Sequence, residues 1–193
     1  METVHFTQQT FRSLMECFSR PGDQQRLEPS QEITGLYSAT VSACLTLLDG
    51  EVSFYVANEC PVIQSEIRAW TGAKLVSVDL ADFIIISADC SEQQAQHALQ
   101  HSKVGNLIDP QLSATILYEM TDHIGNVVHL QGPGIQHTKA VQLNVPEQWL
   151  QLREMKNNEF PLGIDVLLIN SNSDIIALPR TTKIQEVKQS WHT

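Results

Sequence analysis

Basic residues are scarce in this 193-residue sequence, where 12 lysines and arginines stand against 22 aspartates and glutamates and give a formal net charge of −10 at pH 7. The basic residues form no run anywhere along the chain. A surface of this charge repels nucleic acid and anionic lipid unless its basic residues cluster, so we expect no nucleic-acid partner. Small anions are not excluded, because a few arginines around a pocket can outweigh a distant negative field.

Long apolar runs are missing as well. The longest, FIII at 83–86 and VLLI at 166–169, are far shorter than the roughly 20 residues that a membrane-spanning helix needs. The first residues, METVHFTQQT, lack the basic region and the apolar stretch of a secretory leader. The sequence therefore predicts a cytoplasmic protein that does not enter a membrane.

The cysteines are few and scattered, and no CxxC pair occurs. A disulfide framework and a zinc or iron–sulfur site held by this chain alone are both disfavoured, and we expect no metal. Reduced, mostly buried thiols are predicted at Cys17, Cys44, Cys60 and Cys90. Familiar catalytic patterns are also absent, since the sequence has no Walker phosphate loop, no GxSxG, no HExxH and no EF-hand loop. The usual routes to nucleotide hydrolysis, acyl transfer and zinc proteolysis are thereby removed.

The sequence does contain enough apolar material for a core. Hydrophobic residues make up 42% of the chain, and a chain of this size and composition folds without disulfide or metal staples. We expect one domain over residues 1–193, with a loose C-terminal tail from about residue 185.

Hydrophobic periodicity predicts helices between short strands in the first half. A helix over 7–19 is indicated by the apolar stripe of Phe11, Leu14, Met15 and Phe18. Ser91 and Gln94 form the pattern of a capping box and open a helix that runs to about residue 102. Further elements are a helix over 41–48, a helix capped by Asn58 with Pro61 in its first turn, and strands at 52–56, 74–78 and 82–87.

The second half is richer in strands. Residues 113–119 and 126–130 flank a turn at 122–125 and are predicted to pair as a hairpin. A further strand is expected within 135–143 and a helix from Pro146, and a second apolar pair follows at 164–169 and 175–178. Helices alternate with strands early and strands cluster late, which predicts an α/β fold with a mixed sheet and helices packed on its faces.

Two segments could present groups to a phosphate. QGPGI at 131–135 follows a strand and could offer backbone N–H groups, although the third glycine of a dinucleotide fingerprint is replaced by His137. A tight connection between strands explains the same glycines. Arg180, Thr181 and Thr182 come just after an apolar strand, where ligands often bind at the carboxyl ends of sheet strands. A salt bridge with capped backbone groups is the competing interpretation.

Asp165 is an acid at the start of an apolar strand, within FPLGID. Such a position is costly unless the carboxylate is hydrogen-bonded or paired, so Asp165 either fixes the preceding turn, pairs with an arginine, or serves as a base or cofactor partner. We expect Arg180 and Asp165 to pair across neighbouring strand ends.

The histidines offer a weaker signal. His97 and His101 are four residues apart on a predicted helix and could share a metal, but two exposed histidines on a polar face are commoner. The others cluster near the predicted hairpin, at His123, His129 and His137.

Taken together, these segments resemble the PhnH family, a small subunit of the bacterial carbon–phosphorus lyase core complex. The likeness rests on FPLGIDVLL and ALPRTT within 160–182, and it is supported by TFRSLMECFSRPG at 10–22, SATVSACLTLLD at 38–49 and LQGPGI at 130–135. It runs in order from about residue 7 to 184, with a weaker middle at 88–112.

The resemblance implies a three-layer α/β fold with helices on both faces of the sheet. It implies kinship with the large domain of pyridoxal-phosphate-dependent transferases, without their cofactor site. Implied partners are PhnG, PhnI and PhnJ type subunits, in a complex that displaces adenine from ATP by an alkylphosphonate to give ribose 1-phosphonate 5-triphosphate. A later radical step on an iron–sulfur subunit breaks the carbon–phosphorus bond. The resemblance implies no catalytic residue and no cofactor for this chain.

Three functions compete at this point. The favoured one is a noncatalytic accessory subunit that docks on larger partners and can form a homodimer when isolated. The second is a stand-alone enzyme that binds a phosphorylated substrate at QGPGI and PRTT. A pyridoxal-phosphate enzyme is the third, although none of the six lysines stands in a context that suggests a buried aldimine. If the chain contacts a ligand at all, the expected contacts are Arg180, Thr181, Asp165, Gly132 and Gly134.

Overall fold

The computed structural model describes residues 2–121 and 125–186. The helices within these residues are α1 (Glu2–Ser19), α2 (Ser38–Leu47), α3 (Pro61–Thr71), α4 (Glu92–His101) and α5 (Glu147–Lys156), with a short 3-10 helix η1 (Pro110–Leu112). The strands are β1 (Gln24–Arg26), β2 (Ser53–Val56), β3 (Lys74–Leu75), β4 (Phe83–Ile86), β5 (Thr115–Glu119), β6 (Asn126–Gln131), β7 (Lys139–Leu143), β8 (Asp165–Ile169), β9 (Asp174–Leu178) and β10 (Lys183–Glu186).

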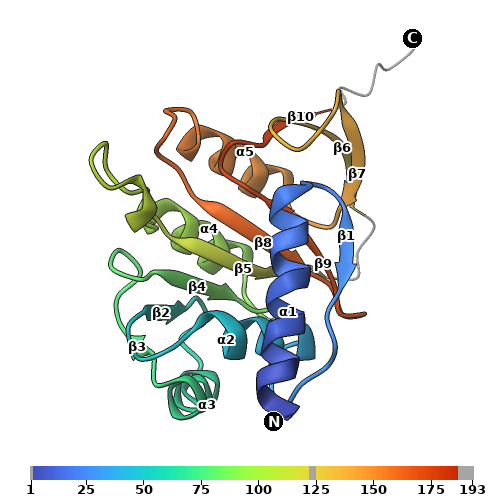
Figure 1. Ribbon diagram of the computed structural model, residues 1–193. Coiled ribbons are helices and arrows are strands. Elements are labelled where there is room, and N and C mark those ends of the chain that lie inside the picture. The colour runs from blue at the N-terminus through green and yellow to red at the C-terminus, as the bar shows by residue number, and fades with distance from the viewer. Residues whose placement is uncertain (1, 122–124, 187–193) are drawn as a thin grey trace.

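A seven-stranded mixed sheet runs through the middle of the molecule (Figure 1). Its strand order is β1-β9-β8-β5-β4-β2-β3. Strands β3, β2, β4, β5 and β8 are parallel, whereas β9 is antiparallel to β8 and β1 is antiparallel to β9. The α/β class and the mixed central sheet expected from the sequence are confirmed.

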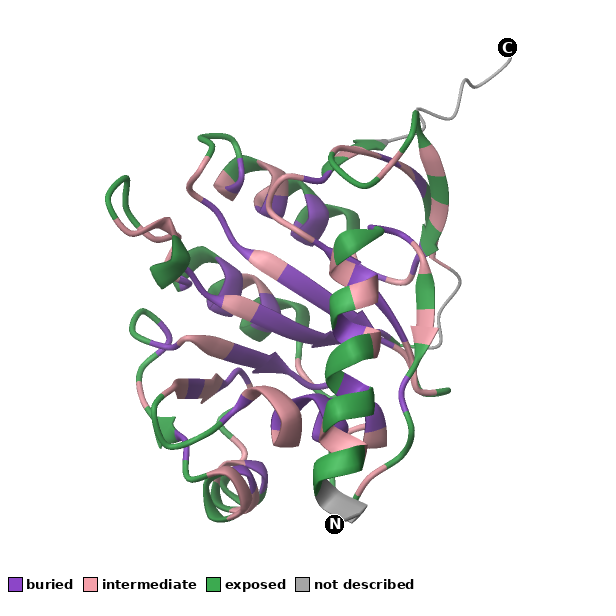
Figure 2. Cartoon of the chain, viewed as in Figure 1, coloured by how far each residue is buried: buried purple, intermediate pink, exposed green. Residues whose placement is uncertain are grey.

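Helices cover both faces of this sheet, because its central strands are apolar on both sides. Alternate residues of β4 enter different clusters: Ile84 and Ile86 pack with α4 and α5, and Ile85 packs with α1, α2 and α3. A strand buried on both faces needs a continuous apolar run, and FIII supplies it. Figure 2 shows the resulting buried strip along the central strands. Three layers follow, namely helices, sheet and helices.

A small second sheet has the order β10-β6-β7 and is antiparallel throughout. The predicted hairpin between residues 113–119 and 126–130 is therefore wrong: β5 pairs in parallel with β4 and β8, and β6 pairs with β7 and β10. The burial of the two strands explains the separation. Strand β5 is buried over its last four residues, as a central parallel strand must be, whereas β6 begins with two exposed residues. Most of the turn expected at 122–125 lies outside the described residues.

Most of the other predicted elements are present. The capping box at the start of α4 is confirmed, since Ser91 Oγ accepts from Gln94 N and the Gln94 side chain accepts from Ser91 N. The antiparallel pair at the end of the chain is confirmed in β8 and β9. Strand β10 extends to Glu186, and the rest of the loose tail expected from about residue 185 lies outside the described residues.

The predicted cap of α3 is wrong by two residues. Cys60, rather than Asn58, occupies the N-cap position, and Pro61 begins the helix as expected. Asn58 instead shapes the turn before the helix, because its Oδ1 accepts from Cys60 N at 3.3 Å and its Nδ2 donates to Ser87 Oγ at 3.0 Å.

None of the helices in residues 2–121 and 125–186 combines the length and the apolar character that a membrane span requires.

Replacing Ser91 by alanine should destabilise the fold through α4. The change removes one acceptor of the capping box, and we expect the free energy of unfolding to fall by about 1 kcal/mol in urea denaturation. Ser65→Ala is the control, because the Ser65 hydroxyl is exposed and donates only to the Val62 carbonyl one turn earlier. Equal effects of the two substitutions would contradict a capping role for Ser91.

Candidate functional site

Arg180 and Asp165 form a partly buried ion pair. Asp165 opens β8 and Arg180 follows β9, and the antiparallel register of Val166 with Leu178 brings these two strand ends together. Arg180 Nη2 lies 2.5 Å and Nε lies 3.2 Å from Asp165 Oδ2, while the backbone N–H of Arg180 donates to Oδ1 at 2.7 Å. The side chains are only 18% and 21% exposed. The predicted pairing is confirmed.

The remaining guanidinium protons of Arg180 also point at protein acceptors. Nη1 donates to the carbonyl of Pro110 at 2.8 Å and, at the 3.5 Å limit, to that of Pro161. Nη2 donates to Ser113 Oγ at 2.5 Å as well as to Asp165. An arginine side chain has five N–H donors, and all five are accounted for by these contacts and the Nε bond. A phosphate could reach this guanidinium only by displacing a bond that joins two parts of the chain.

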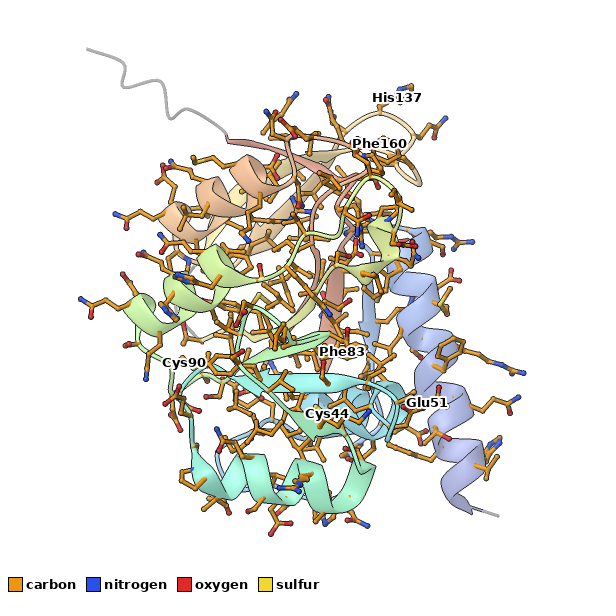
Figure 3. All side chains as sticks on the ribbon, turned by 90° about the vertical axis from the view of Figure 1, so that its left-hand side faces the viewer. Cys44, Glu51, Phe83, Cys90, His137 and Phe160 are labelled. Atoms are coloured by element: carbon orange, nitrogen blue, oxygen red, sulfur yellow. The ribbon has the colours of Figure 1, made fainter. Side chains whose placement is uncertain are left out.

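Arg180 does not lie at the edge of the sheet where ligands usually bind. That expectation applies to the carboxyl ends of parallel strands, but β9 is antiparallel to β8, so its carboxyl end meets the amino ends of β5 and β8. The parallel strands β4, β5 and β8 run from left to right in Figure 1, so the amino edge lies on the left of that picture, and Figure 3 looks toward this edge, which carries Phe83 and Phe160. The placement at a carboxyl edge drawn from the sequence was therefore wrong.

The two glycines of the QGPGI segment are used for close approach between segments. A side chain at Gly132 would come within 2.7 Å of the Thr181 carbonyl oxygen, so this turn lies directly against the PRTT segment. Gly134, with φ of +82°, faces elsewhere, because a side chain there would collide with the Ser19 carbonyl and with Pro21 at the end of α1. The structure thus brings Gly132 and Thr181 together with the pair at Arg180, and it directs Gly134 toward α1.

A second arginine supports the PRTT segment from inside. Arg153 on α5 is fully buried, and its guanidinium donates to the carbonyls of Leu178 at 3.1 Å, Pro179 at 2.6 Å and Thr182 at 3.0 Å. Glu154 pairs with the same guanidinium. Burial lowers the pKa of Arg153, and the Glu154 carboxylate opposes that change. The sequence signal for this role was the position of Arg153 one turn after Trp149, on the buried face of α5.

The opposite edge of the sheet contains a buried acid that the sequence analysis missed. Glu119 is the last residue of β5 and is 2% exposed. Its carboxylate accepts from the backbone N–H of Tyr37 at 2.6 Å and of Ala88 at 2.9 Å, and so joins the segments that precede α2 and follow β4. Burial raises the pKa of Glu119, while the two backbone donors lower it. A polar residue at the end of the apolar run TILYE was the only signal in the sequence.

A cavity of about 420 Å³ lies near this edge, between the N-terminal ends of α4 and α5. Cys90 and Tyr118 line it, together with two carboxylate residues at the helix starts, Glu92 and Glu147. Burial raises the pKa of Tyr118 to about 12 and also raises the pKa of Cys90, so both side chains stay protonated at neutral pH. With two acids among its lining residues, the cavity does not favour an anionic ligand.

The remaining candidate residues show ordinary contacts. All four cysteines are free thiols, two buried and two partly buried, as expected. His101 Nδ1 lies 2.9 Å from the His97 carbonyl oxygen, and the centroids of the two imidazole rings are 4.2 Å apart. Within the part of the chain that the structure describes, no group of three histidine, cysteine or acidic side chains could hold a metal ion. His123 lies outside the described residues.

Fold and site together define a three-layer α/β protein whose buried and partly buried polar groups bind its own loops. Comparison with known proteins then identifies the family. A family model described as bacterial phosphonate metabolism protein, PhnH, matches residues 1–185, and the chain therefore belongs to the PhnH family. The resemblance found in the sequence is confirmed.

Two relatives support this assignment. HtxG of Stutzerimonas stutzeri, named as a candidate subunit protein of C-P lyase, is 31% identical over 180 residues, which cover 92% of this chain and 85% of that protein. The PhnH subunit of the alpha-D-ribose 1-methylphosphonate 5-triphosphate synthase of Rhizobium meliloti (strain 1021) is 28% identical over 192 residues, covering 95% of this chain and 92% of that subunit.

Replacing Asp165 by alanine should lower stability. The substitution leaves the Nε–H and the backbone N–H of Arg180 without their acceptor in a mostly buried place, so we expect a loss of about 1–3 kcal/mol in the free energy of unfolding. Glu16→Ala is the control, because it breaks an exposed pair with Arg20 on α1 and should cost about 0.5 kcal/mol or less. An unchanged thermal melt for Asp165→Ala would contradict the anchoring role.

Glu119 should make stability depend on pH. Because the folded chain binds the Glu119 proton more tightly than the unfolded chain, stability falls as pH rises from the ordinary carboxyl value of about 4.5 through the higher folded pKa. Glu119→Gln removes this dependence, so its free energy of unfolding relative to the wild type should improve between pH 4 and pH 8. Urea denaturation across that range measures it, with the exposed Glu51→Gln as control. Parallel curves for wild type and Glu119→Gln would contradict the pKa shift.

Proposed function

We propose that this protein is a noncatalytic accessory subunit of the cytoplasmic carbon–phosphorus lyase core complex. In this role it docks on PhnG, PhnI and PhnJ type subunits and supports the displacement of adenine from ATP by an alkylphosphonate, which gives ribose 1-phosphonate 5-triphosphate. The observation that carries the proposal is the state of Arg180, because the group best suited to bind a phosphate has all of its N–H donors engaged by the chain itself. The relatives named as subunits of C-P lyase and of a ribose-phosphonate triphosphate synthase support it.

We further propose that the fold is related to the large domain of pyridoxal-phosphate-dependent transferases but holds no pyridoxal phosphate. An aldimine needs a lysine amine free to react. The amines of four described lysines donate to nearby acceptors instead, and Lys74 is exposed on the edge strand β3. The four are Lys103 with Asp82, Lys139 with Asp23, Lys156 with Ser102 and Lys183 with Asn157.

A stand-alone enzyme that binds a phosphorylated substrate is the second candidate. It is favoured by one observation, the contact between the Gly132 turn and the backbone of Thr181, which puts the QGPGI and PRTT segments side by side. Substrate would then have to bind at the edge of the sheet that holds the amino ends of the parallel strands, and Arg180 would have to release part of its present network.

Co-expression separates the two functions. As an accessory subunit, the affinity-tagged protein should be recovered with PhnG, PhnI and PhnJ type subunits, and adenine release from ATP and methylphosphonate should require the assembled complex. The isolated protein should show no saturable binding of ATP or methylphosphonate in calorimetry.

Turnover or saturable binding by the isolated protein, lost on Arg180→Ala but kept in a folded Glu16→Ala control, would contradict the accessory role and favour the enzyme. Recovery of the tagged protein alone at every salt concentration would contradict assembly. The mass of the isolated protein in solution tests the homodimer that we propose for the unassembled subunit.

A further inference from the structure

We propose that two loops at the amino edge of the sheet form the docking surface for a partner subunit. The loops are residues 104–112, before β5, and residues 157–163, before β8, and we call them the amino-edge loops. We infer that the occupant is a protein face with an apolar centre and a basic rim. This inference rests on the accessory function proposed above and states where the contact is made.

The amino-edge loops expose large apolar side chains that contribute nothing to the core. Exposed fractions are 76% for Leu107, 89% for Ile108, 51% for Leu112 and 77% for Phe160. Several large apolar side chains exposed on neighbouring segments are unusual for a surface in contact with water only, and they mark sites of protein–protein contact. Contact with another protein surface would remove these apolar side chains from water, which is favourable.

The two loops lie side by side, and Arg180 joins them. Its Nη1 donates to the Pro110 carbonyl in one loop and to the Pro161 carbonyl in the other. The backbone N–H of Gly163 also donates to the Val104 carbonyl at 3.1 Å. In Figure 1 both segments project at the upper left, from the edge of the sheet at which the parallel strands begin. Ile108 and Phe160 are thus close to the groups that Arg180 connects.

Each loop is also held in shape by an asparagine. Asn106 Oδ1 accepts from the backbone N–H groups of Ile108 at 2.9 Å and Asp109 at 2.7 Å, which fixes the turn that carries the apolar tip. Asn157 is 3% exposed and makes two hydrogen bonds with the backbone of Ile164, closing the second loop at its base. Loops held in this way lose little conformational entropy on binding, which favours affinity.

The charges beside the apolar side chains identify the kind of partner. Asp109 follows Ile108, and Glu159 precedes Phe160. Within residues 2–121 and 125–186, neither carboxylate forms an ion pair. The nearby lysines are already engaged, because Lys103 pairs with Asp82, and Lys156 and Lys183 donate to backbone carbonyls. The Asp109 carboxylate accepts a hydrogen bond from Gln111 Nε2 at 3.0 Å, which leaves its charge uncompensated. Two acids without a basic partner among the described residues, on a chain of net charge −10, favour a partner face with lysines or arginines around an apolar centre.

The test uses the full protein co-expressed with tagged PhnG, PhnI and PhnJ type subunits. Ile108→Asp and Phe160→Asp should each lower the recovery of this chain with the tagged subunits by about tenfold or more, because each puts a charge at the centre of the contact. Val62→Asp and Val127→Asp are matched controls on α3 and β6, with exposed fractions of 51% and 52%, and should leave recovery unchanged. Thermal melts of all four isolated variants should match the wild type, because the sites are exposed.

The outcomes separate this inference from the proposed function. If the wild type is recovered with the tagged subunits and both loop variants are recovered equally well, the docking surface is wrong and the accessory function stands. Loss of recovery with Phe11→Asp on α1, but not with Ile108→Asp, would move the contact to α1 and would likewise overturn the inference. A loop variant that turns a dimer of the isolated chain into a monomer without changing recovery would assign the loops to a second copy and overturn it too. Failure of the wild type itself would contradict the proposed function and this surface together.

Discussion

The structure depends on one guanidinium group. Arg180 donates to the carboxylate of Asp165, the hydroxyl of Ser113 and the carbonyls of Pro110 and Pro161, and these acceptors come from two separate segments, 110–113 and 161–165. A charge with little access to water is tolerated only when its hydrogen bonds are satisfied. Removing one partner therefore lowers stability by more than the net contribution of that hydrogen bond, because the remaining group stays buried and unsatisfied. This one side chain therefore ties together the loops before β5 and β8 at the amino edge, whereas Asp82 holds the starts of β2 and β4 through Ser53 and Lys103.

At the carboxyl edge of the parallel strands, Glu119 likewise joins two segments by accepting from their backbone N–H groups. Beneath the PRTT segment, Arg153 donates to three carbonyls through Nη1 and Nη2, although its buried Nε–H has no acceptor within the described residues. In each case the hydrogen bonds of a charged side chain hold loops in place, so that side chain is not free to act on a substrate. This use of polar groups agrees with a protein whose contribution is the shape it offers to partners.

The sequence predicted much of the fold because periodicity and caps are local signals. The helix before Pro21, the capping box at Ser91 and the antiparallel pair β8–β9 could all be derived from neighbouring residues. The apolar stripe of that helix was only half right, because Phe11 and Met15 are 48% and 51% exposed. The pairing of Asp165 with Arg180 could also be predicted from the sequence, because an acid at the start of an apolar strand needs a partner. The family was recognised from FPLGID and LPRTT, and it matches residues 1–185.

The errors concern relations between distant segments. The pairing of β5 with β8 rather than with β6 depends on which strands fill the centre of the sheet, and a turn signal near residue 122 does not report it. The edge assigned to Arg180 was wrong because the direction of β9 in the sheet is a tertiary property. Glu119 and Arg153 were missed as anchors because their burial follows from packing, whereas a sequence shows only a polar residue beside apolar ones.

Hydrogen–deuterium exchange of the chain alone and within the assembled complex tests the central claim most directly. If the chain works by docking through loops that Arg180 holds together, assembly should slow exchange in residues 104–112 and 157–163. Adding ATP and methylphosphonate to the isolated chain should leave residues 131–135 and 179–182 unchanged. Slower exchange at 131–135 and 179–182 in the isolated chain with these ligands, and no change in the two loops on assembly, would contradict the account.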